Sequence, residues 1–313
     1  MRTRATRRTI LRSALAGAVG MSLTPWLSFA DEPAKGTRKK LLFFTRSQGH
    51  PHDAVTRKTP DELAYGEKLF KQWGEECGYD ITVSKDGRIF DPGAIDQWDA
   101  FAFYTTGDEK QLKGTKEKSD TTPPMSPAGK EALLKAVAAG KGFLGLHSAT
   151  DTFLSQSHDS VILPAGAKDV DPYIQMIGGE FVGHGKQQKA TLRVADSTFP
   201  GLVGLKDVEQ LNEEWYSINN ISPDLHVILV QDTTTMADDK GQRQKEYQRE
   251  PYPQTWARMH GKGRVFYTSM GHRQDVWNSA LYKQIVVAGL KWICGDVQAD
   301  ITPNLKRACP KLG

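Results

Sequence analysis

The sequence predicts an α/β protein with a mainly parallel, doubly wound sheet. Apolar segments of strand length alternate with helical patterns along the first half of the chain, which is the rhythm of βαβ units. Several of these segments also run directly into polar residues, and ligands bind at the carboxyl ends of the strands in such sheets. The clearest case is residues 142–151, where a buried-strand pattern ends at His147, two small residues and Asp151.

The first thirty residues have the pattern of a twin-arginine export signal. Arg7 and Arg8 form the arginine pair, residues 13–27 are mildly apolar, and residues 28–30 offer small side chains ahead of a cleavage site. The apolar part is too short and too rich in small residues to anchor firmly. A disordered basic tail is the alternative. We expect a folded protein exported to the periplasm or beyond, with residues 31–38 as a polar linker.

Removal of the signal also removes an excess of positive charge. Five of the 41 Lys and Arg residues and none of the 37 Asp and Glu residues lie there, which leaves 36 basic against 37 acidic residues. A nucleic-acid partner therefore has no electrostatic support. No later segment has the roughly 20 apolar residues that a membrane span needs, so we expect no membrane attachment after signal removal.

The predicted elements of the first half follow from the spacing of apolar residues. Consecutive apolar residues predict buried strands, and apolar residues that recur every three or four positions predict helices. One helix begins with Ser126 and Pro127 and is followed by Gly140, which are usual start and stop signals. The predicted elements are strands at residues 40–46, 79–84 and 98–104 and helices at residues 62–77 and 126–139.

The second half has a more mixed pattern. Residues 111–124 and 236–252 are polar without regular spacing, so we expect surface loops there, the second a candidate lid. The predicted elements are short strands at residues 189–194, 208–216, 226–231, 254–259 and 264–269 and a closing helix at residues 279–294.

The strand-to-helix turn at residues 142–151 resembles a nucleophile elbow without a nucleophile. Its apex is His147, where an amidotransferase would carry Cys and an α/β-hydrolase would carry Ser. The three cysteines, Cys77, Cys294 and Cys309, lie in no catalytic context. A Cys294–Cys309 bridge and unpaired buried thiols both remain open. The sequence therefore argues against a thiol enzyme.

Five histidines lie at glycine-rich or strand-end positions: His50, His52, His147, His184 and His272. Neutral imidazoles there could transfer protons or bind a divalent metal, although no metal motif of fixed spacing is present. The candidate catalytic residues are His147, His184, Asp108 and Asp151. The candidate metal ligands are His52, His147 and His184.

An acidic and aromatic segment suggests a sugar site. Glu214, Trp215 and Tyr216 combine a carboxylate for hydroxyl groups with rings for the C–H face of a sugar. A tryptophan that caps the core beside solvated glutamates is the alternative. We expect substrate binding by residues at this and other strand ends, namely His52, Glu214, Trp215, Tyr216, Trp256 and His272.

Several motifs together resemble the trehalose-utilisation, or ThuA-like, family from about residue 39 to residue 295. The resemblance implies a class I glutamine amidotransferase-like fold, a flavodoxin-like three-layer sandwich, without the amidotransferase Cys-His-Glu triad. The domain would span residues 39–297, with a tail at residues 298–313. One departure is Arg258, where relatives often carry a histidine. The motifs are TTGD at 105–108, GFLGLHSATD at 142–151, the glycine-rich residues 178–184, EEWY at 213–216 and GRVFYTSMGH at 263–272.

The resemblance implies a role in carbohydrate catabolism. Trehalose-like disaccharides or 3-keto-glycosides would be the substrates, a sugar dehydrogenase would be a partner, and the reaction would be hydrolysis, elimination or isomerisation by acid-base or metal-assisted chemistry. A noncatalytic sugar-binding or accessory protein on the same scaffold is the alternative. Converging imidazoles with a carboxylate beside them would favour catalysis, and separated imidazoles under an aromatic shelf would favour binding.

Overall fold

The computed structural model describes residues 38–107, 117–237 and 241–312. The expected export signal, nearly all of the expected linker and the candidate acid Asp108 lie outside these residues. No helix in the described ranges is long and apolar enough to cross a membrane.

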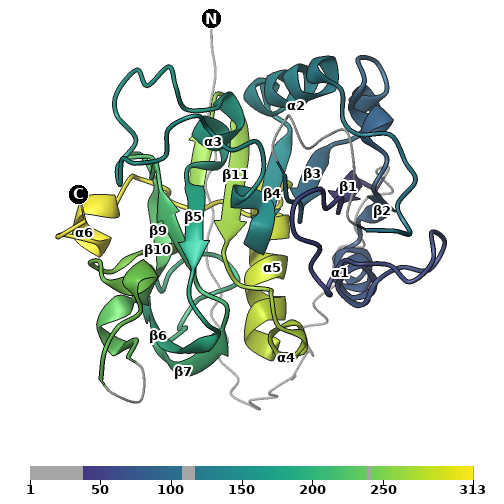
Figure 1. The fold of residues 1–313 in the computed structure, drawn as a ribbon. Coiled ribbons are helices and arrows are strands. Elements are labelled where there is room, and N and C mark those ends of the chain that lie inside the picture. The colour runs from purple at the N-terminus through teal and green to yellow at the C-terminus, as the bar shows by residue number, and fades with distance from the viewer. Residues whose placement is uncertain (1–37, 108–116, 238–240, 313) are drawn as a thin grey trace, which may run out of the picture. The chain divides into compact units, whose positions relative to one another are not determined.

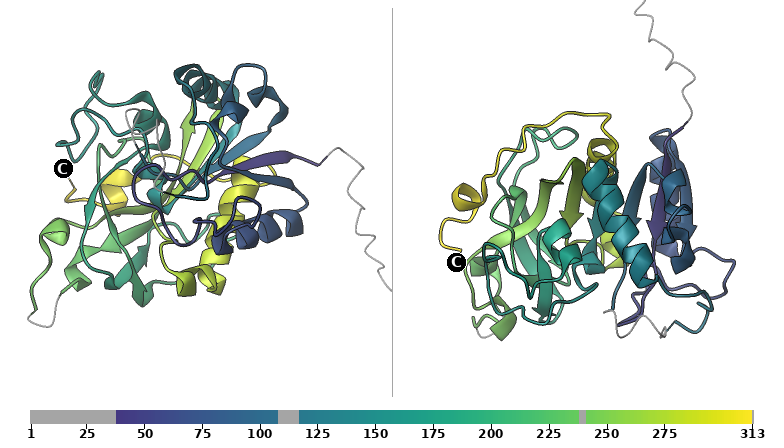
Figure 2. Two further views of the ribbon diagram at one scale, coloured as in Figure 1. Left: turned by 45° about the vertical axis from the view of Figure 1, so that its right-hand side comes forward. Right: turned by 90° about the horizontal axis from the view of Figure 1, so that it is seen from above.

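A nine-stranded sheet runs in the order β2-β1-β3-β4-β11-β10-β9-β6-β7. The first five strands in this order are parallel and the others pair antiparallel. In Figure 2 the earliest parallel strands, in purple and blue, lie on the side away from the green strands of the antiparallel part. The parallel strands are β1 (Lys40–Phe44), β2 (Asp80–Ser84), β3 (Ala100–Phe103), β4 (Gly142–Leu146) and β11 (Gly263–Thr268). The antiparallel strands are β6 (Gln188–Val194), β7 (Val208–Glu213), β9 (His226–Asp232) and β10 (Tyr252–His260).

Helices cover both faces of the parallel part (Figure 1). Alternate residues of β1 face opposite layers: Leu41 and Phe43 pack in one core with α1 and α5, and Leu42 and Phe44 pack in a second core with α2 and α3. This is the predicted three-layer, doubly wound sandwich, and the order β2-β1-β3-β4 is that of flavodoxin-like sheets. The helices are α1 (Tyr65–Glu76), α2 (Pro127–Ala139), α3 (Pro172–Ile177), α4 (Gln274–Trp277), α5 (Ala280–Ile293) and α6 (Leu305–Ala308).

The predicted ends of α2 are confirmed. The Ser126 side chain accepts a hydrogen bond from the Gly129 N–H, which satisfies one of the free donors at the start of the helix. Gly140 ends the helix with φ of +128°, a conformation that side-chain-bearing residues rarely adopt.

The prediction of one continuous strand over residues 208–216 is wrong. The main-sheet strand β7 ends at Glu213, and the chain re-enters regular structure as β8 (Tyr216–Asn219), which pairs with β5 (Glu180–His184) in a separate two-stranded sheet. The break lies where Trp215 turns into the core and donates its indole N–H to the Gln188 carbonyl at 2.8 Å. No glycine or proline marks this break in the sequence, so the change of sheet was concealed.

The described part of residues 236–252 is attached to the core. Tyr247 is fully buried, and its hydroxyl donates to the Trp215 carbonyl and accepts from the Gly185 N–H, both at 2.8 Å. All three cysteines are free thiols, so the structure contains no Cys294–Cys309 bridge.

Candidate metal centre

Four side chains of metal-ligand type converge at the carboxyl edge of the parallel strands. His52 follows β1, His147 follows β4, His272 follows β11, and Glu214 lies between β7 and β8. Each offers one ring nitrogen or carboxylate oxygen, and these four atoms lie within 4.8 Å of one another. The three ring centroids are 5.0, 5.3 and 5.4 Å apart. We call these four residues the histidine–glutamate cluster.

His147 stands at the apex of a sharp strand-to-helix turn. A single turn of 3-10 helix, His147–Thr150, begins directly after β4, and His147 has φ of +43°. A non-glycine residue in this left-handed region carries strain, and such strain is concentrated at functional sites. Gly145 permits the close packing under the turn, because a Cβ there would lie 2.7 Å from the Ile177 side chain. The predicted elbow is therefore confirmed, with an imidazole at its apex.

A backbone carbonyl fixes the tautomer of His147. Nδ1 lies 2.7 Å from the Ser269 carbonyl oxygen, which can only accept, so Nδ1 carries the hydrogen and Nε2 keeps a lone pair. The buried Nε2 has no hydrogen-bond partner and faces Glu214 Oε2 at 3.5 Å. Two electron-rich atoms thus face each other in the interior. The same N–H to carbonyl contact orients histidines that ligate metals.

The loop that carries His52 is held by a buried lysine. Lys85 donates from Nζ to the carbonyl oxygens of Thr45 and Val55, both at 2.8 Å, and so braces the two ends of the loop. His52 is only 3 % exposed. Its Nε2 lies 3.3 Å from the Tyr216 hydroxyl, and its Nδ1 has no hydrogen-bond partner.

Glu214 connects the cluster to its surroundings through both carboxylate oxygens. Oε2 lies 3.1 Å from His272 Nδ1, and Oε1 lies 3.6 Å from His184 Nδ1. The preceding residue, Glu213, is fully buried, and burial raises its pKa to about 7 although two backbone N–H groups donate to its carboxylate.

Burial and charge set the protonation of the cluster. Burial lowers the pKa of His52 and of His147, so both rings are neutral near neutral pH. At His272 burial also opposes protonation, but the facing Glu214 carboxylate outweighs it and raises the pKa. At Glu214 burial opposes ionisation, but the facing His147 and His272 rings hold the pKa well below its ordinary value. The cluster therefore combines an anionic carboxylate with two neutral imidazoles.

The histidine–glutamate cluster has the ligand types that a divalent transition-metal ion binds. Each histidine has one buried ring nitrogen without a hydrogen bond, namely His52 Nδ1, His147 Nε2 and His272 Nδ1. Buried polar atoms are rarely left without a partner, because the lost hydration costs about 1–3 kcal/mol for each group. Imidazole nitrogens together with a carboxylate oxygen form a ligand set that Zn²⁺ and similar ions accept. A cation would satisfy the three nitrogens and the facing carboxylate at once.

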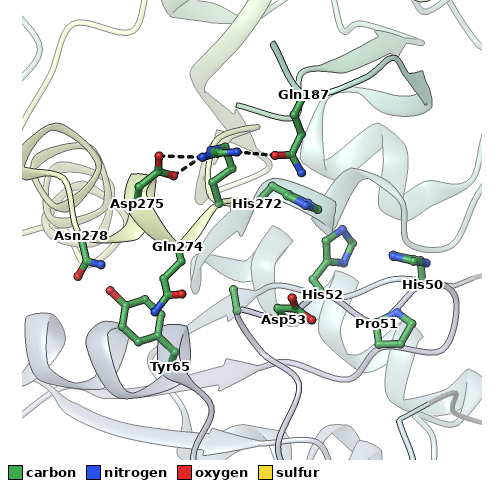
Figure 3. Close-up of a pocket in the computed structure, with 12 residues that line it drawn as sticks. His50, Pro51, His52, Asp53, Tyr65, Gln187, His272, Gln274, Asp275 and Asn278 are labelled. Carbon is green, nitrogen blue, oxygen red and sulfur yellow. Dashed lines mark hydrogen bonds and ion pairs between the residues drawn. The ribbon is translucent and has the colours of Figure 1, made fainter. Parts of the chain in front are cut away.

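A pocket of about 670 Å³ opens onto two members of the cluster, His52 and His272 (Figure 3). His147 and Glu214 are not among the described residues that line it, so the cluster is reached from the side of His52 and His272. The other lining residues are mostly polar: His50, Pro51, Asp53, Ala54, Tyr65, Gln187, Arg273, Gln274, Asp275 and Asn278.

One wall of the pocket is cross-linked by Arg273, the residue that follows His272. Its guanidinium donates to both carboxylate oxygens of Asp275 at 2.9 and 3.0 Å and to Gln187 Oε1 at 2.6 Å, the bonds dashed in Figure 3. Gln187 belongs to the turn between β5 and β6, so this contact ties that turn to the segment that carries His272.

A family model described as ThuA, trehalose utilisation, matches residues 40–293. The chain belongs to the ThuA family. No curated protein matches the sequence.

Solved structures agree with the ThuA assignment. A protein from Bacteroides uniformis ATCC 8492 described as ThuA-like is 16 % identical, covers 89 % of this chain and 100 % of its own, and superposes with a TM-score of 0.60. A ThuA-like protein from Parabacteroides merdae ATCC 43184 is also 16 % identical, covers 85 % and 95 %, and has a TM-score of 0.53. At these identities the likeness establishes the fold, in keeping with the predicted class I glutamine amidotransferase-like sandwich.

His184 lies outside the histidine–glutamate cluster of this ThuA-family protein, although the predicted ligand set included it. Its side chain is 43 % exposed, and Nδ1 lies 2.9 Å from the Gly185 carbonyl oxygen. His184 lies on strand β5 of the small sheet, so it reaches Glu214 without joining the three clustered histidines. His272 and Glu214, predicted as substrate-binding residues, belong to the cluster instead.

The two predicted tryptophan platforms are wrong in this structure. Trp215 and Trp256 are fully buried, and their indole N–H groups donate to the carbonyls of Gln188 and Ile177, both at 2.8 Å. Neither ring offers a face to a ligand. The alternative of a tryptophan that caps the core is therefore correct for Trp215, but its solvated glutamates are not, because Glu213 and Glu214 are buried.

Tyr216 covers the cluster rather than a substrate. It is 2 % exposed, and its ring centroid lies 4.2 Å from that of His147. Asp151, a candidate acid or base, follows the 3-10 turn, and its carbonyl accepts from the Gly107 N–H at 2.9 Å. It is not among the described residues that line the pocket.

The missing histidine at position 258 is of no consequence for this cluster. Arg258 pairs with Asp224 at 2.9 and 3.0 Å and donates to the carbonyls of Gln175 and Met176. It therefore fixes the end of α3 instead of a ligand.

Sequence reasoning also missed residues that line or support the site. Asp53, Gln187 and Arg273 line the pocket, and Tyr104 packs its ring against His52 and His147. The adjacency of Arg273 to His272, and the position of Tyr104 at the end of β3, were the available signals.

Proposed function

We propose that this ThuA-family protein is a metal-dependent enzyme of carbohydrate catabolism. The observation that carries the proposal is the histidine–glutamate cluster, in which three buried imidazole nitrogens without hydrogen bonds adjoin one carboxylate. His52, His147, His272 and Glu214 would hold the ion. When bound, a divalent cation would supply Lewis-acid polarisation of a sugar carbonyl or hydroxyl oxygen.

The pocket supports a carbohydrate substrate. Its lining is rich in planar polar side chains that hydrogen-bond hydroxyl groups, such as Gln187, Gln274 and Asn278, and Tyr65 adds an aromatic ring. Arg273 is neutralised by its pair with Asp275, so a neutral polyol fits this wall better than an anion. We propose trehalose-like disaccharides or their 3-keto derivatives as the substrate class, in keeping with the family description.

Proton transfer falls to residues at the pocket rather than to those predicted from sequence. His50 and Asp53 are exposed and line the pocket next to His52, with the His50 and His52 rings 5.6 Å apart. We propose that they act as general acid and base toward a sugar held against the cluster, in hydrolysis, elimination or isomerisation. Tyr216 and Tyr104 would exclude water from the inner side of the cluster, because both are buried against its rings.

We also propose export by the twin-arginine route to the periplasm, on the evidence of residues 1–30. That route carries folded proteins, and a sugar dehydrogenase would be a partner if the substrate is a keto sugar. Protease protection of the full-length protein in fractionated cells tests this, and replacing both Arg7 and Arg8 with Lys should leave the protein in the cytoplasm.

Metal content and turnover test the enzymatic proposal together. We expect the purified full-length protein to contain about one divalent ion per chain and to convert a disaccharide or 3-keto-glycoside. Glu214→Gln should lose the ion and the turnover, because the carboxylate is the only anionic member of the cluster. His184→Ala is the control and should keep both.

A second outcome would redirect the proposal. The noncatalytic alternative is favoured if the protein binds sugar in calorimetry but neither the wild type nor a metal-supplemented sample turns substrate over. Convergence of the imidazoles beside a carboxylate, together with the burial of the tryptophans, supports the catalytic proposal over that alternative. A wild-type protein that takes up no ion after supplementation would contradict the metal site.

A further inference from the structure

Glu213 is a buried carboxylate that accepts hydrogen bonds from the backbone of one proposed metal ligand and of the residue that precedes another. It ends β7, is fully buried, and precedes Glu214. Its Oε1 accepts from the Glu214 N–H at 2.8 Å, and its Oε2 accepts from the Gly271 N–H at 2.9 Å. Gly271 precedes His272. One side chain therefore joins the N–H of one ligand to the residue next to another.

Gly271 is also held through its carbonyl group. Its carbonyl accepts from the Tyr104 hydroxyl at 3.0 Å and from the Trp277 indole N–H at 2.6 Å. Gly271 has φ of +119°, and a Cβ there would lie 2.3 Å from the Tyr282 hydroxyl. The direction in which His272 leaves this peptide is thus set by the contacts at Gly271, and Glu213 supplies the one that comes from β7.

We propose that Glu213 is a positioning residue that clamps Glu214 and His272 into a shared metal-binding geometry. The inference rests on the metal site proposed above. The strands concerned, β7 and β11, lie far apart in the main sheet, separated by β10, β9 and β6. The sheet ladder therefore does not hold these two ligands together directly. Glu213 does so with two hydrogen bonds, and the ligand atoms lie 3.1 Å apart.

The presence of a carboxylate at position 213 favours a role beyond packing. Burying a carboxylate is costly, and natural cores fill such positions more cheaply with apolar side chains. A carboxylate offers two acceptor oxygens on one rigid plane, which is what two converging N–H donors require. An amide offers one acceptor and one donor, so Gln at this position would lose one of the two tethers.

The matched control is Glu180, a second fully buried glutamate. Its Oε1 accepts from the Ser155 N–H at 2.6 Å, and its Oε2 accepts from the Asn220 side-chain amide at 2.7 Å. It resembles Glu213 in burial and in hydrogen bonding, but it contacts no member of the histidine–glutamate cluster. Glu213→Gln and Glu180→Gln should therefore cost similar stability and differ in metal binding.

The experiment compares Zn²⁺ affinity and the visible spectrum of the Co²⁺-loaded protein in the full-length wild type and both variants. We expect Glu213→Gln to weaken Zn²⁺ binding about 10- to 100-fold, as loss of contacts behind metal ligands does, and to shift the Co²⁺ bands. Glu180→Gln should bind within about threefold of wild type with an unchanged spectrum. If Glu213→Gln does not fold, Glu213→Asp replaces it, since the shorter side chain keeps the charge but reaches only one of the two N–H groups.

The outcomes separate this inference from the proposed function. Wild-type Zn²⁺ affinity and an unshifted Co²⁺ spectrum in the position-213 variant would overturn the positioning role while leaving the metal site intact. Equal weakening in both variants would overturn it too, because the effect would then be one of general stability. Failure of the wild type to bind either ion would overturn the metal site, and the role of Glu213 with it.

Discussion

Two buried histidine–carboxylate pairs in this molecule use the same residue types in opposite ways. In the antiparallel half, His226 places Nδ1 2.9 Å from the Thr302 carbonyl oxygen and Nε2 2.9 Å from Asp196 Oδ2. At the cluster, His147 also places Nδ1 on a carbonyl, but its Nε2 is 3.5 Å from Glu214 and makes no hydrogen bond. The first pair is complete by itself, whereas the second leaves room for a ligand. A structural histidine is therefore distinguished from a candidate ligand by whether both ring nitrogens have hydrogen-bond partners, rather than by how deeply the ring is buried.

The largest effect should come from removing the imidazole at the elbow. We expect His147→Asn to weaken Zn²⁺ binding more than about 100-fold, because a direct ligand is lost where even supporting residues contribute 10- to 100-fold. Asn tolerates the left-handed conformation of residue 147, so the turn should persist and the free energy of unfolding should fall by only about 1–2 kcal/mol. Isothermal calorimetry and urea denaturation measure the two quantities. Near-normal Zn²⁺ binding by this variant would place the ion elsewhere.

Loss of the His226–Asp196 pair should have the opposite effect: it should reduce stability and leave metal binding nearly unchanged. We expect His226→Ala to lower the free energy of unfolding by about 2–3 kcal/mol, because Asp196 loses a buried partner. Zn²⁺ affinity should stay within about threefold of wild type. If the variant lost the metal as well, the contrast between satisfied and unsatisfied histidines would not describe this protein.

The smallest effect should be a shift of metal affinity with pH. The pKa of His272 is raised above its ordinary 6.5, so in the metal-free protein this ring is protonated below that raised value and must release a proton to bind a cation. Zn²⁺ affinity should therefore rise about tenfold per pH unit as pH approaches the raised pKa from below, and then level off. His52 and His147, whose pKa values are lowered, should contribute little to this rise.

The raised pKa of His272 also predicts how the stability of the metal-free protein changes with pH. A raised pKa in the folded state means that the His272–Glu214 pair stabilises the metal-free protein fully below pH 6.5 and loses this contribution as pH rises through the raised value. Calorimetry in buffers of different ionisation enthalpy, together with denaturation of the metal-free protein across this range, measures both effects. An affinity independent of pH between 5.5 and 8 would contradict the assignment of the proton to His272.

The parallel half of the fold was predictable because local pattern and long-range structure agree there. Residues 41–44, 100–103 and 142–146 are continuously apolar, and each segment is buried in the middle of the sheet. The elbow at His147 was predictable for the same reason. In the second half, residues 208–216 read as one strand, because no glycine or proline marks the point at which Trp215 turns into the core.

The cluster was predicted in part. His147 directly follows β4, and His52 and His272 lie in the loops after β1 and β11, so all three reach the carboxyl edge of the parallel strands. Glu214 reaches this edge from the end of β7, an edge strand of the antiparallel half. The spacing of residues in the sequence does not reveal that position. His184 was chosen over His272 because its glycine-rich setting suggested a ligand, whereas its strand belongs to the small sheet.

The distribution of the four cluster residues along the chain has a consequence for folding. They span residues 52 to 272 and come from both halves of the main sheet, so no short fragment contains a complete site. Native contacts of such large sequence separation form late, after most of the chain has been ordered. A cation at this site would bind the folded state in preference to the unfolded chain and would stabilise it by mass action. Metal uptake would thus report that the whole domain, from its first strand to its last, has been assembled.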